Sequence, residues 1–158
     1  MYQFLRMLHV LGWSGWFGLA IAEPILGAQV RKAEGKGKAA LANAWLRVGR
    51  VQLAFMLIAI LFGLATFFLL GSMGTLGMAG FMRQPSNLYL HLMLGLGLLA
   101  GVLTLLAGAS RGTAARAVEA NDTGAFAKAY PRAAMFSGMS SLLILATILE
   151  VLLRGMTL

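Results

Sequence analysis

The stretch Leu5–Leu26, LRMLHVLGWSGWFGLAIAEPIL, decides the fold. It is apolar and long enough to cross a bilayer as a single helix. At about 3.6 residues per turn, His9, Trp16 and Glu23 fall close to one face, and Trp13 lies one turn from His9. A membrane helix turns a face that carries polar side chains toward protein, a cofactor or water, and away from lipid. We therefore expect the rest of the chain to pack against this face.

The composition is that of an integral membrane protein. The chain has 158 residues, of which 59% are hydrophobic and only 11% are charged, and its mean hydropathy is +0.82. A soluble domain has about a quarter charged residues. The chain contains no cysteine, which excludes disulfides, Cys-ligated iron–sulfur clusters and covalently attached c-type haem. Its length suits one membrane domain over residues 1–158.

Four apolar segments predict membrane-spanning helices, at about 3–28, 51–71, 87–109 and 133–153. Most basic residues fall in the connections 29–50 and 110–132, and the formal net charge is +8. Because membrane topology explains this placement, we expect a lipid bilayer as the partner and no nucleic acid. The positive-inside rule predicts cytoplasmic basic connections and both termini outside, in a bacterial cytoplasmic (inner) membrane. The Gly- and Met-rich connection broken by Pro85 predicts an irregular cap.

An internal repeat divides the chain into halves at about 1–75 and 83–158. The octapeptide ALANAWLR at 40–47 matches AFAKAYPR at 125–132, and Leu8-His9 recurs as Leu90-His91. We interpret each half as a helix, a basic loop with a short amphipathic helix, and a second helix. Since each half crosses the membrane twice, both halves run in the same direction. The predicted fold is all-α: a polytopic membrane four-helix bundle built from two parallel two-helix repeats.

The two histidines occupy equivalent places in the two halves. His9 and His91 lie at similar depth near the outer face, which suits two axial ligands of one metal. In a four-helix bundle the natural occupant is b-type haem. Gly12 and Gly95, about one turn from these ligands, leave room for a flat macrocycle. For a single histidine, the alternative is an interfacial side chain that hydrogen-bonds a carbonyl.

Other residues complete the predicted haem site. Arginines at the outer end are candidate partners of the haem propionates; they are Arg6, Arg83 and Arg154. Trp13 and Trp16 are expected to pack against the porphyrin edge. Glu23 is either a proton relay or quinone partner, or it pairs with one of the arginines near the inner surface, Arg31, Arg47 or Arg50.

Copper is the rival cofactor. Five methionines lie near the outer face, namely Met7, Met73, Met78, Met82 and Met93. Thioethers combined with imidazole suit Cu(I). The alternative is that these methionines fill gaps in apolar helices.

The stretch LHVLGWSGWFGLAIAEPIL resembles the first helix of the HemJ-type protoporphyrinogen oxidases and the related CopD-like membrane proteins. These families share a Leu-His, a Trp-Phe seven residues later and then a Pro, here His9, Trp16-Phe17 and Pro24. The third helix, NLYLHLMLGLGLLA, is similar in its aromatic-Leu-His start at 89–91. The resemblance implies a four-helix bundle that binds haem b through histidine. HemJ-type enzymes oxidise protoporphyrinogen and pass electrons to quinone, and CopD-like relatives are linked to copper handling.

One position departs from the family pattern. The family has a lysine two residues after the third-helix histidine, and this chain has Met93. That lysine is associated with activity, so whether the chain is an enzyme is left open. We expect a membrane-embedded b-type haem protein with an electron-transfer role, alone or as an accessory subunit of a larger redox complex. The alternatives are a HemJ-type porphyrinogen oxidase, a CopD-like copper-binding or copper-transport protein, and a cofactor-free structural subunit.

Overall fold

The computed structural model describes residues 1–73, 77–84 and 87–155, apart from the side chains at 36 and 151–155. These ranges form five helices and contain no strand: α1 Tyr2–Lys32, α2 Gly35–Met73, α3 Gly77–Arg83, α4 Leu88–Glu119 and α5 Thr123–Gly155. The all-α fold predicted from the sequence is confirmed.

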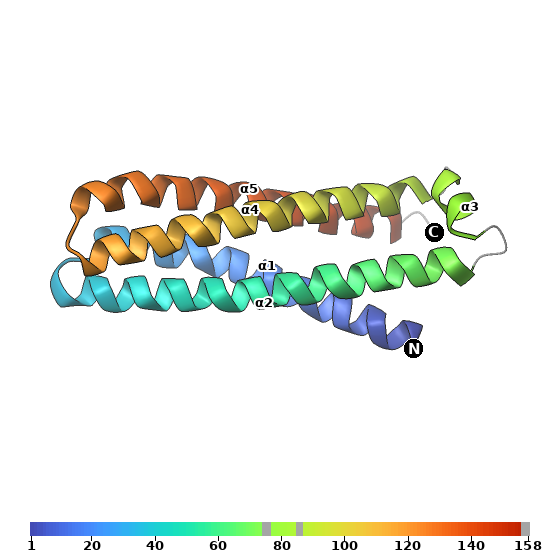
Figure 1. The fold of residues 1–158 in the computed structure, drawn as a ribbon, viewed down its shortest axis with the longest axis horizontal. Coiled ribbons are helices and arrows are strands. Elements are labelled where there is room, and N and C mark those ends of the chain that lie inside the picture. Colours follow the sequence, from blue (N-terminus) through green and yellow to red (C-terminus); the bar gives the residue numbers. More distant parts are fainter. Residues whose placement is uncertain (74–76, 85–86, 156–158) are drawn as a thin grey trace.

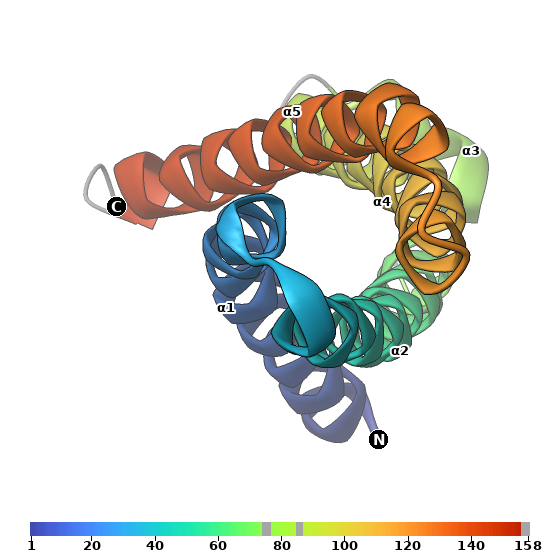
Figure 2. The ribbon, with the colours of Figure 1, turned by 90° about the vertical axis from the view of Figure 1, so that its left-hand side faces the viewer.

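The four long helices form two hairpins. Helices α1 and α2 make one hairpin, α4 and α5 make the other, and both turns lie at the same end of the bundle (Figure 1). The N-terminus, the described end of α5 and the short helix α3 lie at the opposite end (Figure 1). We call these the turn end and the open end. Seen along the bundle, the helices follow the order α1, α2, α4, α5 around a common axis, and each packs against its two neighbours in this order (Figure 2). Helices α1 and α4 are therefore one diagonal pair, and α2 and α5 are the other.

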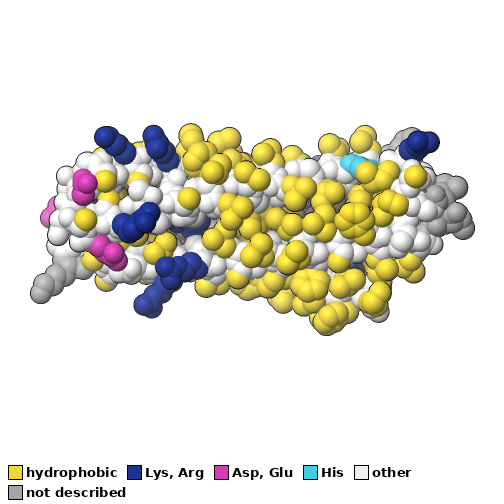
Figure 3. All heavy atoms as spheres, viewed as in Figure 1, with side chains coloured by type: hydrophobic (Ala, Val, Ile, Leu, Met, Phe, Trp, Pro, Cys, Tyr) yellow, Lys and Arg dark blue, Asp and Glu magenta, His cyan; other side chains and the backbone are white. Residues whose placement is uncertain are grey.

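The surface of the bundle is that of a multi-pass membrane protein. Each of the four long helices is long and apolar enough to cross a membrane. Apolar side chains cover the middle of the face in Figure 3, and Lys and Arg gather at the turn end. Leu61, Phe68 and Leu142 are each more than half exposed, as lipid-facing residues are.

The helices extend well beyond the predicted spans. Each predicted span lies within one helix to within one residue, but the connections 29–50 and 110–132 are helical except at 33–34 and 120–122. The expected basic loops are therefore helix ends that carry Lys and Arg. Alanine-rich sequence, which favours helix, explains the extension. Gly35 and Asn121, with φ of 56° and 54°, allow the chain to reverse in so few residues.

The connection at the open end also differs from the expected irregular cap. Residues 77–83 form α3, which packs against α2. Residues 74–76 and 85–86, which include Pro85, lie outside the described part of the chain.

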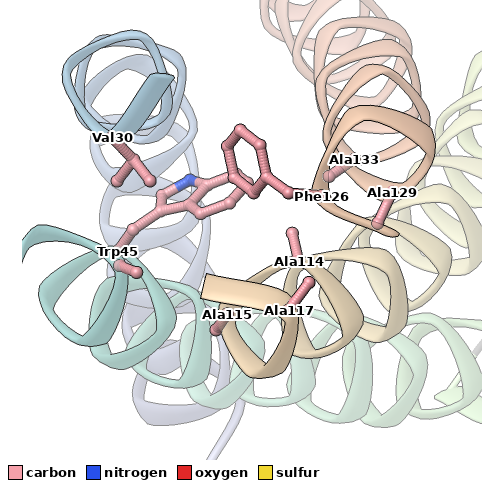
Figure 4. Packing of buried hydrophobic residues seen from close by; sticks show 9 residues of the cluster. Val30, Trp45, Ala114, Ala115, Ala117, Phe126, Ala129 and Ala133 are labelled. Atoms are coloured by element: carbon pink, nitrogen blue, oxygen red, sulfur yellow. The ribbon is translucent and has the colours of Figure 1, made fainter. Parts of the chain in front are cut away.

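The turn end has its own apolar core. Trp45 and Phe126 point into the space between the helices, beside Val30 and among alanines of α4 and α5 (Figure 4). The Trp45 ring also contacts that of Tyr130, with centroids 6.0 Å apart. Trp45 and Tyr130 are equivalent positions of the two matched octapeptides. The repeated segments therefore meet across the bundle at this end.

Candidate functional site

His9 lies on α1, half-buried against α2. Its Nδ1 is 2.7 Å from the backbone oxygen of Ala59, and the indole N–H of Trp13 donates to its Nε2 at 3.1 Å. A neutral imidazole that carries its proton on Nδ1 satisfies both contacts, since it donates from one nitrogen and accepts at the other. Both ring nitrogens of His9 thus have partners within the protein.

His91 lies in the first turn of α4 and meets two other helices. Its Nδ1 is 2.8 Å from the backbone oxygen of Asn87, and its Nε2 is 3.1 Å from the Sδ of Met82 on α3. The ring also stands edge-on to Phe67 of α2, with centroids 5.8 Å apart. The imidazole is therefore fixed in orientation, with its Nε2 toward a thioether.

Asn87 holds this arrangement together. Its side-chain amide donates to the backbone oxygen of Phe81 at 2.9 Å and to Oε1 of Gln84 at 3.3 Å. These bonds tie the end of α3 to the start of α4. They keep Met82 close to His91.

The two histidines have different partners. No hydrogen bond or ring contact between His9 and His91 occurs among the described residues. Both rings face α2, His9 at Ala59 and Gly63 and His91 at Phe67. Ligation of a haem by both imidazoles stays a prediction, and it requires His9 to give up one of its hydrogen bonds.

The glycines chosen for a macrocycle have other surroundings. A Cβ atom at Gly12 would clash with the backbone of Ala59, so Gly12 brings α1 close to α2. A Cβ atom at Gly95 would meet nothing within 4 Å. Gly12 therefore serves helix packing and leaves no gap for a cofactor.

The tryptophans pack inside the bundle. Trp16 is completely buried, and its indole N–H donates to Thr104 Oγ1 at 3.2 Å. Trp13 stacks at a tilt on Trp16, with centroids 5.0 Å apart. A Cβ atom at Gly97 of α4 would lie 3.4 Å from the Trp13 ring. Both indoles thus fill the space that the diagonal helices α1 and α4 leave between them.

The outer arginines have no ion pair in the described part of the chain. Arg6 and Arg83 are exposed, and the ion pair that the described residues form joins two other side chains. The side chain of Arg154 lies outside the described part. Their proposed role toward haem propionates stays a prediction.

The methionines at the open end differ in their surroundings. Met78 and Met82 are one turn apart on α3 and so lie on the same face. Met78 packs against α2 at Gly71, where a Cβ atom would meet its sulfur. Met7 and Met73 are exposed, and Met93 is half-buried. No three His, Cys, Asp or Glu side chains come together within the described ranges, so thioethers are the donors that accompany His91.

A buried ion pair lies nearer the turn end. Arg111 Nε is 3.4 Å from Glu23 Oε1, and the two side chains are 0% and 1% exposed. The Nη2 of Arg111 donates to Gln52 Oε1 at 3.2 Å, and Ser137 donates to the second carboxylate oxygen of Glu23. This network joins all four long helices.

The expected partners of Glu23 were wrong. Arg31, Arg47 and Arg50 are exposed, and the partner is Arg111. Sequence reasoning missed Arg111 because it follows the predicted end of the third span and was assigned to a solvated connection. Its place on the continuous helix α4 turns it inward. The proton-relay and quinone roles of Glu23 stay predictions.

Comparison of the chain with protein-family models, curated proteins and solved structures finds no match. The similarity to HemJ-type and CopD-like proteins thus rests on the sequence motifs alone.

Proposed function

We propose that this multi-pass membrane protein binds Cu(I) at the open end of its bundle, with His91 Nε2 and Met82 Sδ as ligands. The distance of 3.1 Å between these two atoms carries the proposal. A neutral imidazole has one N–H, and the contact of Nδ1 with the Asn87 carbonyl places that proton on Nδ1. The Nε2 lone pair then faces a sulfur that is itself only a weak acceptor. Two lone pairs at this distance do not attract each other. A soft cation between them would be coordinated by both.

The contact with Asn87 also matches how proteins orient metal-binding histidines. A ligating histidine commonly donates its second N–H to a backbone carbonyl, which fixes the tautomer and the ring orientation. The Nδ1 of His91 has this contact at 2.8 Å. His9 lacks a free nitrogen, because Trp13 donates to its Nε2. We therefore assign the metal to His91 alone of the two histidines.

The donor types select the metal. Thioether and imidazole are ligands that suit Cu(I), while carboxylates and carbonyls suit Mg²⁺, Ca²⁺ and Mn²⁺. Met78, one turn from Met82 on α3, is the candidate for a third ligand. The absence of cysteine from the chain leaves methionine as its only sulfur donor.

The surroundings of the site suit exchange of the ion. Met82 is exposed and His91 is half-buried, so the ligands are reachable from outside the bundle. Phe67, which is buried, contacts the imidazole with its ring perpendicular to it. We propose that the protein takes up and hands on copper at the membrane surface.

We place this end outside the cytoplasm, because the exposed Lys and Arg gather at the turn end. The chain has no cysteine, so single-cysteine variants report topology without background. A membrane-impermeant maleimide added to intact cells should label Gln84→Cys at the open end and spare Lys128→Cys at the turn end. The reverse labelling would contradict this orientation.

Cu(I) binding is tested by titrating the purified protein, in detergent and under reducing anaerobic conditions, against a chromophoric Cu(I) chelator. The wild type should retain one Cu(I). His91→Ala and Met82→Leu should each weaken binding by about tenfold or more, the factor that corresponds to about 1.4 kcal/mol. Met139→Leu, at an exposed methionine of α5, is the matched control and should bind as the wild type does.

Three outcomes would contradict the proposal. The first is failure of the wild type to retain Cu(I), and the second is equal binding by all variants. The third is a haem spectrum with a Soret band that His9→Ala abolishes and Met82→Leu leaves unchanged. That result would favour the b-type haem protein expected from the sequence.

A further inference from the structure

We infer that a cavity between α2 and α4 near the turn end binds one oxygen of a phosphate-type oxyanion. The cavity has a volume of about 30 Å³ and is lined by Leu46, Gly49, Arg50, Leu53, Gly108 and Arg111. A volume of about 10–15 Å³ is enough for one water-sized group. The cavity therefore admits one oxygen of an oxyanion, and the rest of the ligand lies outside it. This inference is independent of the copper proposal.

The main evidence for a ligand is a buried nitrogen of Arg111 that has no partner in the described part of the chain. Its side chain is completely buried, its Nε pairs with Glu23 and its Nη2 donates to Gln52. Its third nitrogen, Nη1, has no hydrogen-bond partner among the described residues. Buried donors of this kind are nearly always paired. The unpaired N–H groups of Nη1 are therefore the expected contact for a ligand.

The position of Nη1 connects it to the cavity. It lies against the backbone of Gly49, so closely that a Cβ atom there would clash with it. Gly49 and Arg111 both line the cavity. The free donor of Arg111 thus lies beside Gly49, one of the residues that line the cavity.

The charged residues around the cavity indicate that its ligand is an anion. Glu23 pairs with Arg111, and Arg50, a second basic residue, also lines the cavity. The side chain of Arg50 is exposed, so the cavity is reachable from the surface. Guanidinium groups match phosphate oxygens in geometry and charge. Basic pockets between membrane helices bind anionic lipid headgroups.

Two kinds of ligand could supply the phosphate oxygen, namely the phosphodiester of a lipid and free orthophosphate. Native mass spectrometry of the delipidated full-length protein distinguishes them, with phosphatidylglycerol and orthophosphate added separately. Arg50→Gln removes the exposed guanidinium. Gly108→Ala narrows the cavity with little strain, because its Cβ would meet only Leu53 at 3.5 Å. Arg132→Gln removes an exposed arginine of α5 and is the matched control.

We expect the wild type and Arg132→Gln to retain one phosphatidylglycerol. Arg50→Gln should retain it about fivefold more weakly, the factor for one basic residue near an anionic surface, and Gly108→Ala should also bind it more weakly. Retention of orthophosphate but not lipid, with the same order of variants, supports the oxyanion site and assigns the free ion. Equal retention by all variants, equal losses in Arg50→Gln and Arg132→Gln, or no retention of either ligand would overturn the inference.

Discussion

The two ends of the bundle treat their polar groups differently. Toward the turn end, Glu23 and Arg111 are buried and bonded to side chains of α2 and α5. At the open end, Met82 is exposed beside the half-buried His91. Helices α1 and α5 diverge there (Figure 1). A buried ionic network fixes helices in place, whereas donors near the surface remain able to exchange a metal ion. We therefore assign the ion pair a role in holding the helices together and assign copper binding to the open end.

The largest expected effect is on the ionic network. Replacing Arg111 by Met leaves the Glu23 carboxylate buried without its charge partner, which should lower the free energy of unfolding by about 3–5 kcal/mol. The measurement is denaturation by SDS in mixed micelles. Arg116→Met, at an exposed arginine on the same helix, is the control and should change stability by less than about 0.5 kcal/mol.

The double replacement of Glu23 and Arg111 sharpens this test. Apolar residues at both positions remove the unpaired charge, so the double variant should be more stable than Arg111→Met alone. Equal stability of Arg111→Met and Arg116→Met would show that the pair does not hold the helices together.

A smaller effect is expected where α1 approaches α2. Gly12→Ala places a Cβ atom against the backbone of Ala59, which cannot move without shifting α2. The cost should be about 1–3 kcal/mol. A Cβ atom at Gly18 of the same helix meets nothing within 4 Å, so Gly18→Ala should be as stable as the wild type. A neutral Gly12→Ala would mean that the helices are not in close contact there.

Much of the fold follows from sequence pattern. Hydropathy located the four spans, because the lipid core demands long apolar helices. The prediction that the polar face of α1 packs against the rest of the chain was also correct, since Trp16 and Glu23 are buried. The helix extensions were not predicted, because the connections 29–50 and 110–132 are polar and were interpreted as loops. Their alanine content was the overlooked signal.

The sites were harder to predict. A helical wheel places a side chain on a face of its own helix but does not say which neighbour it meets. The contact of His9 with α2 at Ala59 was not predicted, and its role as a haem ligand stays a prediction. Arg111 was expected in a connection, and it is buried against Glu23. The contact of His91 with Met82 depends on α3, a short helix that the pattern of glycines did not indicate.

The smallest expected effect separates the two histidines. His9→Ala removes the contact with Ala59 and the bond from Trp13, which should cost about 1–2 kcal/mol of stability. Its Cu(I) affinity should equal that of the wild type, because His9 is not a ligand. Denaturation and the chelator titration on the same sample measure both quantities. Weaker Cu(I) binding by His9→Ala would place His9 in the metal site.

X-ray absorption spectroscopy of the Cu(I)-loaded protein tests the assignment of function to the open end most directly. The wild type should show both nitrogen and sulfur scatterers around copper, and the sulfur contribution should fall in Met82→Leu but stay unchanged in Met139→Leu. A copper environment without sulfur, or one that Met82→Leu leaves unchanged, would contradict the account.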